Sequence, residues 1–205
     1  MSKEKPILFS TTMVKAILDG TKTMTRRVNK DLTQYDKVFG YDLDRRSYAV
    51  ARYYPDGTEI CQVELPLKYC SGDILWVRET WLKISSEYIY YVDKNKAVQN
   101  CLKWKPSIFM PKEAARIFLE VKSVRVERLQ TCSVYNNNRE VPDIIAEGIE
   151  IPETCERDCP TPKPDCYVCL FKELWDSLNA KRGYSLESNP WVWVYEFERI
   201  NKESI

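Results

Sequence analysis

The chain has 205 residues, of which 44% are hydrophobic and 30% charged, and its formal net charge is +1. This length and composition predict a single globular domain with a substantial core and argue against wholesale disorder. The chain contains no histidine, which excludes Ser-His-Asp and Cys-His nucleophile systems and every His-ligated metal centre. Any acid–base chemistry therefore has to use Lys, Glu, Asp, Tyr or Cys side chains.

Neither a membrane span nor a signal peptide is expected. No stretch has the apolar length of a bilayer span, and the first ten residues, MSKEKPILFS, lack an apolar signal region. We therefore expect a cytoplasmic protein without a membrane partner, whose 8 cysteines are thiols or metal ligands rather than disulfides. Residues 1–30 hold seven Lys or Arg against two Asp or Glu, which allows a local basic face on a nearly neutral protein.

The N-terminal third is predicted to form a strand, a helix and a hairpin. PILFS at 6–10 indicates a short buried strand, and the apolar spacing after it predicts a helix over 11–19 that Gly20 ends in a left-handed conformation. Residues 31–45 are polar and are expected to be irregular. SYAVARYY and EICQVEL flank the turn sequence PDGT, which predicts a β-hairpin.

The remaining elements are mostly strands. SGDILWVRETW at 71–81 predicts a strand, and EYIYYV at 87–92 predicts a second one as its antiparallel neighbour. A β-branched run predicts a long strand over 117–129, PDIIAEGI at 142–149 predicts a brief helix, and 167–182 an amphipathic helix. NPWVWVYEFERI is apolar on both faces and predicts a final strand inside a sheet. This order favours an α+β domain built on a mixed sheet or a small closed barrel.

A cysteine cluster interrupts this pattern in the sequence CERDCPTPKPDCYVC. Its four cysteines, in a C-x3-C-x6-C-x2-C spacing, are Cys155, Cys159, Cys166 and Cys169. Four thiolates on short loops can hold one tetrahedral zinc ion, and metal binding would order a proline-rich segment. We predict a structural zinc site and no organic cofactor; unliganded thiols and disulfides are the alternatives, because the central spacing of six is shorter than in common zinc fingers.

A basic, hydroxyl-rich segment, DGTKTMTRR, follows the first helix at residues 19–27. Its cationic and hydroxyl side chains suit a phosphate or carboxylate oxygen, and a solvated basic turn is the alternative. The residues that we expect to contact a nucleic acid are Lys22, Thr23, Arg26, Arg27, Arg78 and Trp81. Arg78 ends the strand ILWVR and can reach the mouth of a cleft, and Trp81 lies at the edge of an element, where it can stack on a base.

The segment ILDGTKTMTRR resembles the G-x-K-x-x-T-x-R signature of the ASCH domain superfamily. SGDILWVRETW, RIFLEVKSVRVERL and AEGI are similar, in the same order, to later elements of that family, and residues 171–200 resemble a phage- and prophage-borne branch. The likeness covers most of a single domain, 1–205, with additions at about 31–70, containing the hairpin, and at 150–169, the Cys-rich knuckle. It implies a PUA-like small β-barrel with flanking helices and a cleft beside the basic motif.

The resemblance implies that the protein binds RNA or a modified nucleoside or nucleotide. An alternative is an amidohydrolase that deacylates acetylated cytidine, because Lys22, Thr25 and Glu147 match the lysine, threonine and glutamate of similar bacterial enzymes. A desolvated lysine can activate a threonine hydroxyl, and a glutamate can orient the lysine or protonate the leaving amine. Lys22 and Thr25 are three residues apart and converge only if the backbone turns. A ribonuclease and a phage structural role are further interpretations.

Overall fold

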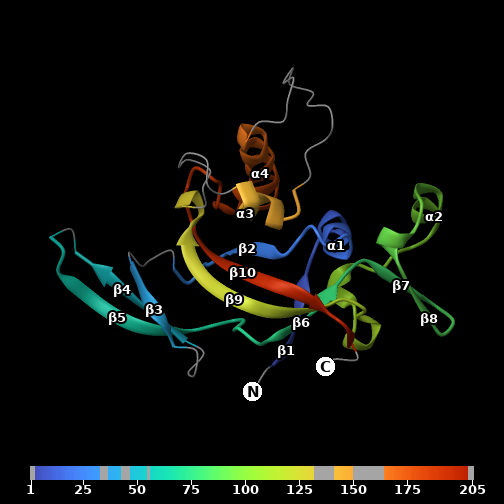
Figure 1. Cartoon of the computed structure of the whole chain (residues 1–205), viewed down its shortest axis with the longest axis horizontal. Helices are drawn as coiled ribbons and strands as arrows, with labels where there is room; N and C mark the ends of the chain where they lie inside the picture. Colours follow the sequence, from blue (N-terminus) through green and yellow to red (C-terminus); the bar gives the residue numbers. More distant parts are fainter. Residues whose placement is uncertain are drawn as a thin grey trace.

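The computed structural model shows an α+β fold whose central sheet has the strand order β1–β6–β9–β10–β2. Its strands are β1 (Glu4–Leu8), β6 (Ile74–Arg78), β9 (Phe118–Arg128), β10 (Trp191–Ile200) and β2 (Met24–Val28). Only β1 and β6 run parallel. The structure describes residues 3–32, 37–42, 47–54, 56–131, 141–149 and 164–202. The long curved strands β9 and β10 cross the middle of the molecule (Figure 1).

The position of β10 in the sheet accounts for its continuous run of apolar residues. It lies between β9 and β2, as predicted for a strand inside a sheet. Val192 and Val194 face a core beneath two helices, whereas Trp193, Tyr195 and Phe197 face a larger core on the other side. Because successive side chains of a strand alternate between faces, a strand covered on both faces must be apolar at every position.

Helices cover both faces of this sheet. Helices α3 (Val141–Ala146) and α4 (Pro164–Asn179) pack on one face through Ile144, Phe171 and Trp175, and Figure 1 shows them above β9 and β10. Helix α1 (Thr11–Leu18) packs into the opposite core through Val14 and Ile17. The three predicted helices are confirmed: α1 and α4 from apolar spacing, and α3 from the proline and glycine at its ends.

The ends of α1 follow the local rules. The Ser10 side chain caps its first turn by accepting a hydrogen bond from the Met13 N–H, and Gly20 follows it with a φ of +78°. A left-handed residue just beyond a helix favours glycine, which has no Cβ. The chain is thereby turned into β2, which carries the basic motif.

A second sheet contains β3 (Lys37–Asp42), β4 (Ser47–Tyr53) and β5 (Glu59–Pro66). The predicted hairpin is confirmed as β4 and β5, but the expectation that 31–45 is irregular is wrong, since β3 pairs with β4. Tyr48 packs edge-on against Trp193 with ring centroids 4.6 Å apart. The second sheet therefore contributes to the main core.

The expected partner of EYIYYV is also corrected. Strand β8 (Glu87–Tyr90) pairs with β7 (Trp81–Ile84) in a hairpin, whereas β6 lies between β1 and β9. The turn passes through Ser85 at a φ of +53°, and the Trp81 and Tyr88 rings pack 5.7 Å apart. A short local turn with a cross-strand aromatic pair forms more readily than a distant pairing.

The other short elements connect these layers. They are the helix α2 (Lys96–Cys101) and the 3-10 turns η1 (Tyr91–Asp93), η2 (Ser107–Phe109), η3 (Lys112–Ala114), η4 (Leu129–Thr131) and η5 (Ala180–Arg182). Within the part of the chain that the structure describes, no helix is both long and apolar enough to cross a membrane.

The central sheet curves without closing into a barrel. Its hydrogen-bonded ladder ends at β1 on one side and β2 on the other in the described ranges. The Arg27 side chain on β2 nevertheless donates a hydrogen bond of 2.6 Å to the Leu8 carbonyl on β1. We call the gap between these two edge strands the seam.

Candidate functional site

A cleft of about 910 Å³ opens along the seam. Residues 5–8 of β1 and 25–28 of β2 line its two sides. Lys68 and Tyr69, which follow β5, and several α4 side chains complete the lining. The cleft is therefore built from segments that lie far apart in the sequence, including the segment that the resemblance marks as an addition.

The lining combines positive charge with aromatic rings. Its acidic residues are Asp31 and Glu147. Its basic residues are Lys5, Arg26, Arg27, Lys30, Lys68, Arg78 and Arg182. Its aromatic residues are Tyr69, Phe171, Trp175, Trp193 and Tyr195. An excess of cations in a partly enclosed space attracts an anion, and aromatic walls suit a flat apolar group.

Lys22 and Glu147, which are 125 residues apart, form a buried ion pair beside the cleft. The Lys22 Nζ donates to the Glu147 Oε2 at 2.8 Å and to the Glu147 carbonyl at 2.7 Å. The lysine side chain is fully buried and the glutamate side chain is 7% exposed. Burial lowers the pKa of Lys22, and the Glu147 carboxylate opposes this shift in part.

The backbone around Gly148 brings α3 against this pair. Gly148 has a φ of +79°, and a Cβ there would lie 2.8 Å from the Ala16 Cβ and 2.9 Å from the Lys22 Cβ. The Thr23 N–H donates to the Ala146 carbonyl at 2.9 Å, and Lys22 and Glu147 form a β-bridge. The end of α3 can approach the basic segment only because residue 148 has no side chain.

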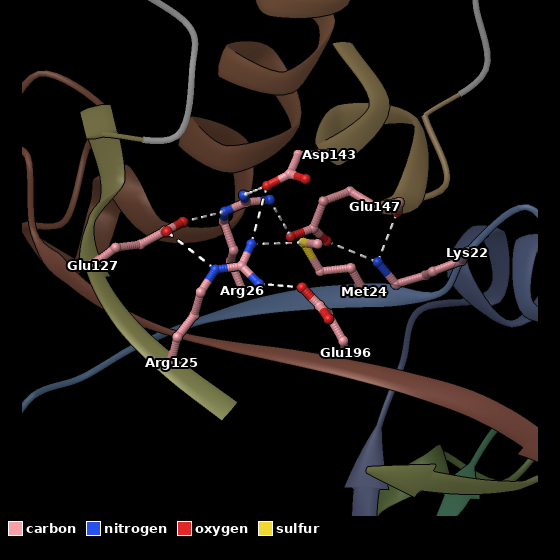
Figure 2. A network of polar contacts seen from close by, with 8 residues as sticks. All are labelled: Lys22, Met24, Arg26, Arg125, Glu127, Asp143, Glu147 and Glu196. Carbon is pink, nitrogen blue, oxygen red and sulfur yellow. Dashed lines mark hydrogen bonds and ion pairs between the residues drawn. The ribbon is translucent and has the colours of Figure 1, made fainter. Parts of the chain in front are cut away.

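Arg26, which was expected to contact a nucleic acid, takes part in a network of carboxylates. Its Nη1, Nη2 and Nε donate to Glu147, Asp143 and Glu127 at 3.1, 3.0 and 3.2 Å. Arg125 extends the network to Asp143, Glu127 and Glu196, between the sheet and α3 (Figure 2). Arg26 is only 5% exposed, and its guanidinium charge is balanced by three carboxylates.

Arg27 points to the other face of β2. It lies opposite Trp193, while Arg26 lies opposite Val194, and these two partners belong to different cores. Besides the Leu8 contact, the Arg27 guanidinium lies 5.1 Å from the centre of the Phe9 ring. Burial lowers the pKa of Arg27, although an arginine keeps its proton at physiological pH.

Thr25 is buried on β2 opposite Tyr195 and lines the cleft. The turn expected to bring it to Lys22 is not formed, because residues 24–28 are a strand and the Lys22 ammonium is bonded to Glu147. Among the described residues, no hydrogen bond joins Lys22 to Thr25. Thr25 and Glu147 nevertheless line the same cleft, while the exposed Thr23 does not.

Arg78, expected at the mouth of a cleft, lines it, whereas Trp81, expected to stack on a base, does not. Trp81 is 5% exposed and packs with Trp76, Met110 and Phe118 in a separate core cluster outside the lining. The indole ring of Trp81 is therefore packed against its neighbours, away from the cleft, and its contact with a nucleic acid stays a prediction. Trp81 starts the β7 hairpin, whose aromatic pairing buries the indole ring.

The zinc prediction stays open. Cys155 and Cys159 lie outside the described residues, and Cys166 and Cys169 both lie on α4, where Cys169 is exposed. In the described segments, no group of three or more His, Cys, Asp or Glu residues could hold a metal ion.

Sequence reasoning missed Lys68, Tyr69 and the aromatic residues of α4 as cleft residues. Lys68 and Tyr69 occur in no motif, and Phe171 and Trp175 were attributed to the core, where they also contribute. Comparison of the chain with protein-family models, with curated proteins and with solved structures found no match. The interpretation of the cleft therefore rests on its own contacts.

Proposed function

We propose that this protein is an ASCH-type, PUA-like domain of a phage or prophage branch, and that it binds RNA or a modified nucleotide in the seam cleft. The sequence motifs support the family. The curved sheet supports a barrel-like architecture in which the Arg27 side chain, rather than a strand ladder, spans the gap between β1 and β2. The cleft supports the class of ligand.

The observation that carries this proposal is the pairing of unbalanced cations with aromatic rings in one cleft. A nucleotide presents a negative phosphate beside a flat base, and proteins hold these with Arg or Lys donors and with aromatic faces. Arg26 and Glu147 neutralise each other, so the excess charge comes from residues such as Arg27 and Lys68. An excess of positive charge would not stabilise an uncharged ligand, whereas it attracts the phosphate of a nucleotide.

The test measures RNA binding by fluorescence anisotropy over a series of salt concentrations. Arg27→Ala should weaken binding about tenfold and reduce the salt dependence by about one counterion, as for the loss of one phosphate contact. Arg199→Ala is the matched control, since Arg199 is an exposed arginine outside the cleft that also donates to a backbone carbonyl. Absent binding at low salt, or equal weakening in both variants, would refute the proposal.

The amidohydrolase is the second candidate, and the buried Lys22–Glu147 pair favours it. A lysine with a lowered pKa is a better base than an exposed one, and Glu147 lines the cleft together with Thr25. Acetylated cytidine should then be converted to cytidine and acetate, and Thr25→Ala should abolish turnover while the fold persists. Turnover that survives Thr25→Ala would remove threonine from the mechanism. Intact RNA after the same incubation would argue against a ribonuclease.

A further inference from the structure

Three of the cations on the β1 side of the cleft form no close ion pair within the described part of the chain, although the Glu147 carboxylate acts on Arg27 from a distance. Arg27, Lys68 and Arg78 all line the cleft, and among the described residues none of them forms an ion pair. Each comes from a different part of the chain: β2, the segment after β5, and the end of β6. Charges of like sign brought together in the absence of a ligand repel each other, which favours the binding of an anion.

Arg27 and Arg78 flank the same residue of β1. The Arg27 Nη2 donates to the Leu8 carbonyl at 2.6 Å, and Leu8 is paired with Arg78 in the parallel ladder. The Arg78 Nη1 donates to the Ile108 carbonyl at 3.2 Å, and its Nε has no hydrogen-bond partner among the described residues. The Arg78 Nε is buried and its guanidinium lies 4.7 Å from the centre of the Trp76 ring, so a ligand would use the remaining Nη donors of Arg78 and of Arg27.

Lys68 approaches from the other end of β1. Its ammonium lies 5.2 Å from the centre of the Tyr69 ring, and that of Lys5 lies 5.8 Å from it. Asp73 balances Lys5 at 3.2 Å, whereas Lys68 has no such partner in the described chain. Partial burial of its head group lowers the pKa of Lys68, although much of the side chain is exposed, and the nearby charges of Arg27 and Lys5 lower it further.

The opposite end of the cleft has a different character. There Arg26 is balanced by Glu147, and the walls include Phe171 and Trp175 of α4. Arg182 of η5 adds one cation on the α4 side, but a ligand with a charged end and a flat end can place its charge at Arg27 and Lys68 and its flat group beside the α4 rings. The volume of about 910 Å³ matches a small-molecule site, so it holds one nucleotide rather than a long stretch of RNA.

We propose that Arg27, Lys68 and Arg78 form a phosphate subsite, and that the cleft takes a nucleotide with a terminal phosphate monoester instead of an uncharged nucleoside. This inference rests on the proposed function, because it places the ligand in the same cleft. Three cations suit a monoester, which carries nearly two negative charges at neutral pH, better than the single charge of a diester. The monoester can belong to a free nucleotide or to the 5′ end of an RNA chain.

The experiment is titration calorimetry at fixed ionic strength with the four nucleoside monophosphates, the four nucleosides and inorganic phosphate. At least one monophosphate should bind about tenfold or more tightly than its nucleoside, since hydrogen bonds between charged groups are worth about 1.5–3 kcal/mol. Short RNA oligonucleotides with and without a 5′-phosphate form the second arm. A preference confined to the phosphorylated oligonucleotide supports the subsite with the chain end as its ligand.

Lys68→Gln is the decisive variant, because Lys68 is exposed and its replacement should leave the fold intact. It should weaken monophosphate binding about tenfold and leave nucleoside binding unchanged. Lys83→Gln is the matched control, since Lys83 is exposed and lies 5.0 Å from the Tyr88 ring but outside the cleft. Arg78→Lys is a second variant that keeps the charge but loses the forked geometry of the donors, and it should weaken only the phosphorylated ligands.

The outcomes separate this inference from the proposed function. Equal affinity for a monophosphate and its nucleoside, or equal weakening of both by Lys68→Gln, would overturn the subsite while the cleft remained a nucleoside site. Failure of every nucleoside, nucleotide and RNA to bind would overturn the proposed function itself. Binding of inorganic phosphate that Lys83→Gln weakens as much as Lys68→Gln would also refute the subsite.

Discussion

Replacement of Glu147 by Gln tests the buried pair most directly, because two buried cations depend on this carboxylate. Lys22 donates to Oε2 at 2.8 Å and Arg26 donates to Oε1 at 3.1 Å, and the side chains of both cations are at most 1% exposed. Gln keeps the shape of Glu but carries no charge, and its NH₂ group would face one of these donors. Lys22 would then be a buried charge without a countercharge.

The expected cost follows from this burial. Removal of one partner of a buried ion pair destabilises a protein by about 3–5 kcal/mol, and Glu147→Gln should fall in this range. Lys22→Met should cost less, about 1–3 kcal/mol, because Glu147 keeps Arg26 as its partner. The double variant should cost about 1–3 kcal/mol less than the sum of the two single variants, since both remove the same contact.

The loss of stability caused by Glu147→Gln should also become smaller as the pH rises. The pKa of Lys22 is already lowered in the folded state, and loss of Glu147 removes what opposes that shift. Between the lowered folded-state pKa and the normal value of about 10.5, the unfolded chain binds more protons at Lys22 than the folded chain does. The stability of Glu147→Gln should therefore rise with pH relative to the wild type, and the deficit should be smaller at pH 9.5 than at pH 7.

Urea unfolding followed by tryptophan fluorescence measures these free energies, provided that the m-values stay equal. Glu187→Gln is the control, because Glu187 pairs with Lys172 at 3.0 Å but is 78% exposed, and it should cost less than about 1 kcal/mol. The reasoning fails if Glu147→Gln costs no more than Glu187→Gln. It also fails if Lys22→Met costs more than Glu147→Gln, or if the deficit grows with pH.

Three further predictions concern the surroundings of the site. Gly148→Ala should cost at least about 1 kcal/mol more than Gly20→Ala in urea unfolding, because both residues are left-handed but only at 148 would the Cβ have contacts below 3.0 Å; equal costs would contradict the close approach. Burial raises the pKa of Tyr195, so stability should fall as pH rises above about 10, where only the unfolded phenol ionises, and Tyr195→Phe should reduce that fall. An unchanged alkaline slope would contradict this. Protein purified without added zinc should contain about one zinc ion per chain, held by the cysteines of 155–169, and a much lower ratio in metal analysis would argue against the site.

Periodic segments of the fold were predictable because each carries its own signal. Apolar spacing located α1 and α4, and a run that is apolar at every position placed β10 inside the sheet. The pairing of strands was harder to predict from the sequence, since it depends on which strands meet in space. EYIYYV was assigned to the strand at 71–81, but the intervening WLKI gave it a nearer partner. Strand β3 was missed because Gly40 interrupts its short apolar run and polar residues flank it on both sides.

The candidate site was predictable only in part. The pairing of Lys22 with Glu147 followed from a family resemblance, because no local pattern relates residues 125 positions apart. Lys68 and Tyr69 reach the cleft because β3, β4 and β5 bring the chain back to β1, where the Tyr69 hydroxyl bonds to the Pro6 carbonyl. A single lysine after a hairpin has no distinguishing signal in the sequence.

The alternation of side chains along β2 explains how the basic segment serves two purposes. Met24 and Arg26 face α3 and α4, where Arg26 joins the carboxylate network, while Thr25 and Arg27 face the partners Tyr195 and Trp193. A turn would have grouped the two arginines as one basic patch, whereas a strand separates them. Arg26 holds the edge strand beneath α3 through three carboxylates, and a fixed edge strand keeps Arg27 in the seam. The structure thus fixes Arg26 against α3 and leaves Arg27 in the cleft, which is why the proposed anion contact is assigned to Arg27.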